Sequence, residues 1–268
     1  MMCRGCDGRK CRERYVLACA EFMMRPTDPQ GKNLDYTKAP RVINNSYGRN
    51  GEPMRQAVAA WRAAGIIPVF AAGNGCTSCG LLAHPAHLDN VIAVGATDND
   101  DVLWSGSCKG PSPTGRVKPD LSAPGDGIRS VSTEGDSTYV TDSGTSMAAP
   151  HVTGTIALML SAHPEYKYDQ VLAKLRQSAV TESLHQSGDE CGGTPDTVFP
   201  NNQFGSGRLD AAKAMRLAAM GDKADPCALL SPLDCVRDSK CLWDQTKGAN
   251  GQCQLRPSDD DSDRPIWS

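Results

Sequence analysis

The residues that point most directly to chemistry lie in one run, 144–154, with the sequence GTSMAAPHVTG. An apolar segment at 156–160 follows, so the run indicates the start of a buried helix with Ser146 in its first turn. Gly144 permits a tight turn, and we expect Pro150 to be tolerated because the N–H groups of a first turn have no helical partner. The positive end of a helix favours a developing negative charge. The pattern therefore predicts a serine nucleophile for acyl transfer.

A serine at a helix start can also be only an N-cap, which is its usual role there. The whole run of residues, rather than Ser146 alone, favours the nucleophile. A second candidate is Asn74, in the run 69–75 with the sequence VFAAGNG. On its own this run indicates a turn. An amide side chain would nevertheless suit an oxyanion site, because it donates from a fixed position without titrating.

The elements that would position these residues alternate between strands and helices. Short β-branched runs predict strands, and apolar residues at helical spacing predict helices. The predicted strands are 41–45, 66–72 and 91–96, and the predicted helices are 15–24, 53–64, 146–161, 168–177 and 208–219. Such alternation is typical of an α/β fold with a parallel sheet.

The run around Ser146 resembles the nucleophile motif of the subtilisin-like serine peptidases (subtilases, peptidase S8 family). The resemblance covers residues 40–218 most clearly. Residues 42–48 (VINNSYG) resemble the family's substrate-lining strand, and 69–75 resemble the segment with its oxyanion asparagine. Further landmarks in the family's order are residues 91–96, 110–111, 118–125 and 205–211. Matches in this order leave little room for chance.

By this resemblance, Ser146 would form the acyl-enzyme, and the Asn74 side chain with the Ser146 N–H would hold the oxyanion. A substrate would add as an extended strand, a mode in which main-chain hydrogen bonds give affinity. Its principal pocket would lie between the walls Ser46, Tyr47, Gly48 and Ala71, Ala72, Gly73. These walls carry no acidic residue, so we expect a preference for apolar side chains before the cleaved bond, rather than for Arg or Lys.

The histidine of the family's triad has no counterpart. The triad follows the chain order Asp, His, Ser, but residues 1–73 contain no histidine. All the histidines follow Asn74, at His84, His87, His151, His163 and His185. His151 lies on the nucleophile helix itself, where its side chain should point elsewhere. None of the five can be assigned as the base.

The acidic member of the triad is missing as well. Asp142, Ser143 and Gly144 imitate the Asp-Ser/Thr-Gly sequence around it, but they run directly into the nucleophile. Asp7, Asp28 and Asp35 do not stand in an Asp-Ser/Thr-Gly sequence. We therefore expect that the chain begins within a domain whose Asp and His segments lie upstream.

Two hypotheses follow. The first is a serine endopeptidase of the subtilisin type, here a fragment without the triad Asp and His and inactive alone. The second is a catalytically dead, subtilase-like binding or scaffold protein. An in-frame Asp-Ser/Thr-Gly and a His-Gly-Thr-His segment upstream of Met1 would separate them.

Both hypotheses place the same domains along the chain. Residues 1–222 form a three-layer, parallel-sheet α/β domain, incomplete at its N-terminus, in which missing strands would expose an apolar edge. We expect a small Cys-rich disulfide module at 223–254, in which Cys227, Cys235, Cys241 and Cys253 form two disulfides with one another in one of three possible pairings. An acidic, disordered tail occupies 255–268.

Twelve cysteines suggest an oxidising compartment. The first residues contain no apolar core of a secretory signal, so we expect an extracellular full-length protein whose signal lies outside this chain. The spacing of Cys3, Cys6, Cys11 and Cys19 raises zinc as an alternative. No histidine lies nearby and the spacing is not that of a paired zinc site, which favours disulfides or buried thiols.

Charge and composition exclude other partners. The net charge is −3 with mixed signs, which disfavours nucleic acid and anionic membranes. The longest apolar stretch, near 65–73, is far short of the roughly 20 residues that span a bilayer. Protein or peptide substrates remain the expected partners, and the sequence does not specify an oligomeric state. The chemistry needs no cofactor and no metal ligands are assigned, although calcium often stabilises this family and the loop 86–91 could present carbonyls to a weakly held cation.

Overall fold

The structure, a computed structural model, describes residues 3, 5–7, 10–48, 52–221, 241–244 and 252–255. The chain divides into two compact units, Met1–Arg216 and Leu217–Ser268. Almost all of the described residues belong to the first unit.

A parallel sheet of four strands forms the centre of the first unit. Its strands are β3 (Val42–Asn45), β4 (Ile67–Ala71), β5 (Ile92–Thr97) and β6 (Leu121–Pro124), in that spatial order. Every residue of β4 and β5 is buried. Such burial is expected where helices cover both faces of a parallel sheet.

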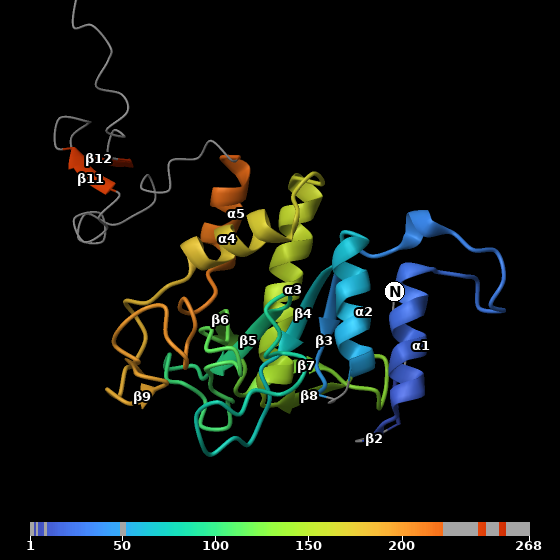
Figure 1. Cartoon of the computed structure of the whole chain (residues 1–268), viewed down its shortest axis with the longest axis horizontal. Coiled ribbons are helices and arrows are strands. Elements are labelled where there is room, and N and C mark those ends of the chain that lie inside the picture. Colours follow the sequence, from blue (N-terminus) through green and yellow to red (C-terminus); the bar gives the residue numbers. More distant parts are fainter. Residues whose placement is uncertain are drawn as a thin grey trace, which may run out of the picture. The chain divides into compact units, whose positions relative to one another are not determined.

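Helices cover the two faces of this sheet and make three layers. Helix α3 (Thr145–Ala162) contacts all four strands, while α2 (Glu52–Ala63) packs on β4 and α1 (Glu13–Met24) packs on α2 (Figure 1). Alternate strand residues, such as Ile43 and Phe70, join the core cluster with Trp61 of α2. Asn44, on the opposite face, accepts a hydrogen bond from Thr153 of α3. The predicted three-layer α/β fold is confirmed.

Shorter elements surround these layers. Three antiparallel pairs lie in the first unit: β1 (Cys6–Asp7) with β2 (Lys10–Cys11), β7 (Ile128–Val131) with β8 (Tyr139–Asp142), and β9 (Glu190–Cys191) with β10 (Thr194–Pro195). The other helices are a 3₁₀ turn η1 (Tyr36–Lys38), α4 (Tyr168–Ser178) and α5 (Ala211–Ala219). In the second unit, β11 (Cys241–Asp244) pairs antiparallel with β12 (Gln252–Leu255).

The predicted strands and helices are all present, with their ends shifted by at most three residues. The largest shift is at α5, which begins at Ala211 rather than at Arg208. The predicted pairing of Cys227, Cys235, Cys241 and Cys253 and the acidic tail fall outside what the structure describes.

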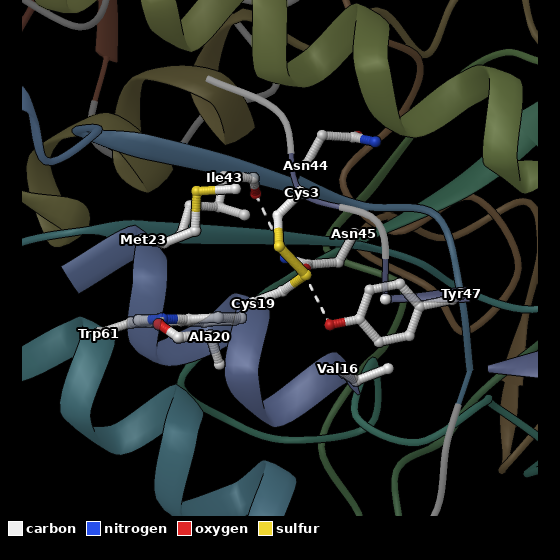
Figure 2. Close-up of a pocket in the computed structure, with 11 residues that line it drawn as sticks. Cys3, Val16, Cys19, Ala20, Met23, Ile43, Asn44, Asn45, Tyr47 and Trp61 are labelled. Atoms are coloured by element: carbon white, nitrogen blue, oxygen red, sulfur yellow. Dashed lines mark hydrogen bonds between the residues drawn. A yellow bond between two sulfur atoms is a disulfide. The ribbon is translucent and has the colours of Figure 1, made fainter. Parts of the chain in front are cut away.

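A disulfide ties the chain before α1 to that helix. Cys3 and Cys19 are bonded, with their Cα atoms 5.5 Å apart, which favours the disulfide interpretation over zinc for these two residues. The bond lies beside a cavity of about 560 Å³ between α1, α2 and β3 (Figure 2). β3 is an edge strand of the described sheet, so this cavity borders the sheet edge.

A buried cluster of charged side chains links the segment directly before β6 to α4. Asp120 accepts from the Lys118 Nζ at 2.6 Å, the Ala93 N–H at 2.8 Å and the Arg176 Nη2 at 2.5 Å. Lys118 and Asp120 are 2% and 3% exposed. A buried carboxylate is tolerated only when it is paired and hydrogen-bonded, and these three donors meet that need.

We predict that Asp120→Asn lowers the free energy of unfolding by about 3 kcal/mol, because it leaves the buried Lys118 ammonium without its counter-charge. Urea denaturation followed by circular dichroism measures this change. Asp136→Asn, at an exposed turn, serves as the control and should change stability by less than about 0.5 kcal/mol. Equal effects of the two substitutions would contradict the prediction.

Candidate active site

Ser146 is the second residue of α3, at the end of the helix that lies against the sheet. The chain enters the helix through Gly144, whose φ of 155° suits glycine. The Gly144 carbonyl accepts from the N–H groups of Met147 and Ala148, at 2.9 and 3.3 Å. Helix geometry leaves the Ser146 N–H without an intrahelical acceptor, so it can donate outside the helix.

Asn74 follows β4 and is held by Thr145 at the start of the helix. Its Oδ1 accepts from the Thr145 N–H at 3.0 Å and from the Thr145 hydroxyl at 2.7 Å. The Thr145 hydroxyl also accepts from the Gly73 N–H at 3.2 Å. Because Oδ1 faces Thr145, the Nδ2 group of this exposed side chain is directed away with both hydrogens available. Thr145 was not singled out from the sequence, although it lies within the Ser146 run.

Pro150 lies beyond the first turn of α3, although the sequence pattern predicted it within that turn. α3 begins at Thr145, so Pro150 is its sixth residue rather than part of the first turn. An N–H at this position would donate to the carbonyl four residues earlier, which is that of Ser146. The expectation that Pro150 costs no helical hydrogen bond was therefore wrong.

The two predicted pocket walls leave the same edge of the sheet. Ser46, Tyr47 and Gly48 follow β3, while Ala71 ends β4 and Ala72 and Gly73 come after it. Parallel pairing of β3 with β4 brings both segments to the carboxyl ends of their strands, close to the start of α3. Ser46 reaches Ser146 directly: its carbonyl lies 3.5 Å from the Ser146 Oγ.

The side chain of Tyr47 points away from this junction. Its hydroxyl donates to Asn45 Oδ1 at 3.0 Å, and its ring meets Phe70 edge-on at 6.0 Å between centroids. Figure 2 shows Tyr47 lining the cavity beside α1. Burial raises the pKa of Tyr47 well above its ordinary value, so the hydroxyl stays neutral and can donate. Tyr47 therefore contributes its main-chain groups to the predicted pocket wall, and its ring lies elsewhere.

Ala83 fills the space between the two walls. A Cβ built on Gly48 would lie 3.1 Å from the Ala83 Cβ, and one built on Gly73 would lie 2.9 Å from it. The Ala83 N–H also donates to the Ala72 carbonyl at 2.8 Å. Both walls thus meet a methyl group. No sequence signal identified Ala83, because only the fold brings it to the walls.

The five histidines make their contacts elsewhere. His84 and His87 meet edge to face with ring centroids 4.7 Å apart, and His163 stacks on Tyr166. His151 Nδ1 lies 2.8 Å from the Met147 carbonyl, within its own helix, and His185 pairs through its backbone with Asp101. Within the described ranges, the Ser146 hydroxyl donates to the Ser46 carbonyl rather than to an imidazole.

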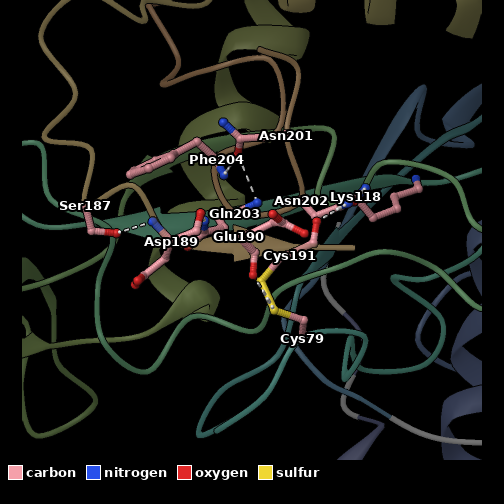
Figure 3. The surroundings of a disulfide bond; sticks show 10 residues. All are labelled: Cys79, Lys118, Ser187, Asp189, Glu190, Cys191, Asn201, Asn202, Gln203 and Phe204. Atoms are coloured by element: carbon pink, nitrogen blue, oxygen red, sulfur yellow. Dashed lines mark hydrogen bonds between the residues drawn. A yellow bond between two sulfur atoms is a disulfide. The ribbon is translucent and has the colours of Figure 1, made fainter. Parts of the chain in front are cut away.

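Two disulfides hold the loop that follows Asn74. Cys76 bonds to Cys108, and the same two segments pair through the Gly75 N–H to the Gly106 carbonyl and the Cys108 N–H to the Gly73 carbonyl. Cys79 bonds to Cys191 at the β9–β10 hairpin (Figure 3). These pairs join residues 32 and 112 positions apart, which the cysteine count alone could not reveal.

The loop 86–91 offers little to a cation at its end. The Val91 carbonyl oxygen accepts a hydrogen bond from the positively charged Lys118 side chain at 2.8 Å. The residues present therefore do not favour Val91 as a calcium ligand.

Comparison with known proteins places this geometry in context. A sequence profile described as the subtilase family matches residues 24–207. The chain is 37% identical to Bacillopeptidase F of Bacillus subtilis (strain 168) over 215 residues, or 77% of this chain and 14% of that protein. It is 39% identical to Subtilisin DY of Bacillus licheniformis over 142 residues, or 52% of this chain and 49% of that protein. The chain thus spans half or less of the length of these relatives.

Solved structures agree at the level of the fold. The chain aligns with a mutant of the protease domain of PatA at a TM-score of 0.60 and 24% identity, covering 81% of this chain and 70% of that one. The structure of the prenylagaramide maturation protease PagA aligns at a TM-score of 0.58 and 23% identity, covering 78% and 68%.

We predict that Gly144→Ala lowers the free energy of unfolding by about 1–3 kcal/mol, because alanine is strained at this φ. Its Cβ would also lie only 3.0 Å from the Asn74 Nδ2. Gly154→Ala is the matched control: it lies in the same helix with nothing within 4 Å of the added Cβ, and should be neutral or stabilising by up to about 1 kcal/mol. Urea denaturation of both variants decides, and a stable Gly144→Ala protein would contradict the prediction.

Proposed function

Because the chain belongs to the subtilase family of serine peptidases, we propose that it carries the acylating half of a subtilisin-type endopeptidase site. Ser146 is the nucleophile, and the Asn74 Nδ2 and the Ser146 N–H are the oxyanion donors. The observation that carries this proposal is the double hydrogen bond from Thr145 to Asn74 Oδ1, beside Ser146 at the helix start. It orients the Asn74 amide beside the start of the helix, which supports its proposed role as an oxyanion donor.

The proton of Ser146 sets the limit on this chemistry. Attack of Oγ on a peptide carbonyl needs a base that removes the hydroxyl proton and returns it to the leaving amine. None of the five histidines is placed for this. We therefore propose that these 268 residues bind a substrate and stabilise an oxyanion, but do not hydrolyse peptides without a base from elsewhere.

The substrate would be an extended peptide along Ser46, Tyr47 and Gly48. Small residues and the Ala83 methyl group between the walls support a preference for apolar side chains of modest size before the cleaved bond. Protein or peptide substrates are the proposed partners. No helix in the described ranges is both long and apolar enough to span a bilayer. The three described disulfides support an extracellular location.

A catalytically dead binding or scaffold protein is the second candidate, favoured because, among the described residues, the Ser146 hydroxyl donates to the Ser46 carbonyl and not to a histidine. The two candidates differ in whether Ser146 reacts. A binding protein would retain the peptide without forming a covalent bond to it.

The first test uses an activated ester, whose good leaving group needs no protonation. We predict that a p-nitrophenyl ester of N-acetyl-trialanine slowly acylates Ser146, as mapped by mass spectrometry of the digested protein. Asn74→Ala should slow acylation by about 10²–10³, as expected for loss of one oxyanion donor. Ser146→Ala should abolish it. Ser143→Ala, three residues before the nucleophile, should leave it unchanged. Acylation that survives in Ser146→Ala would refute the assignment.

The second test uses an unactivated substrate. We predict that the purified chain releases no product from an apolar peptide anilide above the level of Ser146→Ala. Loss of the histidine alone lowers the kcat of a subtilisin by about 2 × 10⁶, so the remaining rate of hydrolysis lies below ordinary detection. A clear rate that depends on Ser146 would show that a histidine after Asn74 reaches the nucleophile.

A further inference from the structure

Pro150 leaves the carbonyl of the nucleophile without its helical donor. In α3 the N–H of residue 150 would donate to the Ser146 carbonyl, but proline has no N–H. The ring of Pro150 is exposed, so it is not retained to fill the core. The helix is thus missing one hydrogen bond at the residue proposed to react.

Ser46 supplies the missing donor from another element. Its hydroxyl, just after the end of β3, donates to the Ser146 carbonyl at 2.9 Å. The carbonyl that Pro150 leaves unpaired in the helix is therefore satisfied by a side chain that belongs to the pocket wall. The two serines also meet in the opposite direction, because the Ser146 hydroxyl lies 3.5 Å from the Ser46 carbonyl.

A short network holds the Ser46 hydroxyl in place. The Asn44 Nδ2 donates to Ser46 Oγ at 3.0 Å, which leaves the hydroxyl hydrogen of Ser46 free to point at Ser146. The Asn44 Oδ1 in turn lies 3.2 Å from the Thr153 hydroxyl, whose single hydrogen is shared with the Ala149 carbonyl at 3.0 Å. Thr153 lies two turns along the helix that carries Ser146. The network therefore begins and ends on α3 and passes through β3.

We propose that Ser46 is a positioning residue for Ser146, whose hydroxyl replaces the N–H that Pro150 lacks. Fixing the Ser146 carbonyl fixes the backbone torsion of that residue, and with it the direction of Oγ relative to the oxyanion donors. This role rests on the proposed function of Ser146 and adds to it. It differs from a substrate contact, because a donor placed elsewhere on the helix could take it over.

Position 150 offers that donor. In Pro150→Ala a new N–H appears at the position that normally serves the Ser146 carbonyl, and the exposed site leaves no cavity. If Ser46 acts through this carbonyl, then Ser46→Ala alone slows acylation of Ser146, and adding Pro150→Ala restores the rate. If Ser46 acts by touching substrate or by general packing, a new backbone donor one turn along the helix corrects nothing.

The hydrogen bond from the Ser46 hydroxyl to the Ser146 carbonyl can be measured by NMR without any catalytic assay. Residues 146 and 147 form the only Ser-Met pair in the sequence, so ¹³C-carbonyl serine with ¹⁵N-methionine gives a single HNCO peak for the Ser146 carbonyl. We expect Ser46→Ala to move this carbon resonance upfield, and Ser46→Ala with Pro150→Ala to move it back. Ser143→Ala should not move it comparably. An unmoved resonance in Ser46→Ala would overturn the proposal.

Acylation by the p-nitrophenyl ester supplies the functional readout. We expect Ser46→Ala to slow acylation of Ser146 by roughly tenfold, and the double variant to recover to within about threefold of the unsubstituted chain. Pro150→Ala alone should leave the rate unchanged. Failure of the double variant to recover, with its carbonyl resonance restored, would overturn the positioning role. If the unsubstituted chain is not acylated at all, the proposed function fails, and the carbonyl resonance alone decides whether Ser46 holds Ser146.

Discussion

The contact between Thr145 and Asn74 is the constraint on which the site depends. It joins the segment that leaves β4 to the first residue of α3, through two hydrogen bonds to one amide oxygen. A neutral hydrogen bond contributes only about 1 kcal/mol to stability. Its importance here is that it orients the Asn74 side chain. Because the amide oxygen already accepts two hydrogen bonds, the side chain can offer only its nitrogen to a ligand. The donor is therefore oriented before any substrate arrives.

That contact can persist because both of its partners are anchored independently. α3 lies against all four strands, and its residues Ala148, Val152 and Ile156 are completely buried. On the other side, Asn74 sits between two backbone hydrogen bonds to residues 106 and 108 and next to the Cys76–Cys108 disulfide. A rigid helix and a tethered loop meet at the carboxyl edge of the sheet, so the junction costs little further ordering.

Sequence reasoning succeeded where the signal is local. The periodicity of α2 and α3 and the apolar runs of β4 and β5 set their boundaries closely. It failed where the partner is distant in the chain. Pairing of Cys79 with Cys191, the position of Ala83 between the walls and the bond from Ser46 to Ser146 all depend on how the strands assemble. Pro150 was wrongly assigned to the first turn, although the predicted helix start at 146 differs from the observed start by only one residue.

In the proposed site, the contacts that orient the oxyanion donor are separate from any group that would transfer a proton. Thr145 holds the Asn74 side chain, which we propose as an oxyanion donor, and Ser46 holds the carbonyl of Ser146, the proposed nucleophile; these contacts lie within the described residues. None of them involves a histidine or the carboxylate that would orient one. Among the described residues, the hydrogen bonds that define the shape of the proposed site therefore do not depend on a base. A site built in this way can keep its shape whether or not a base is present, because no hydrogen bond that defines the shape passes through the base.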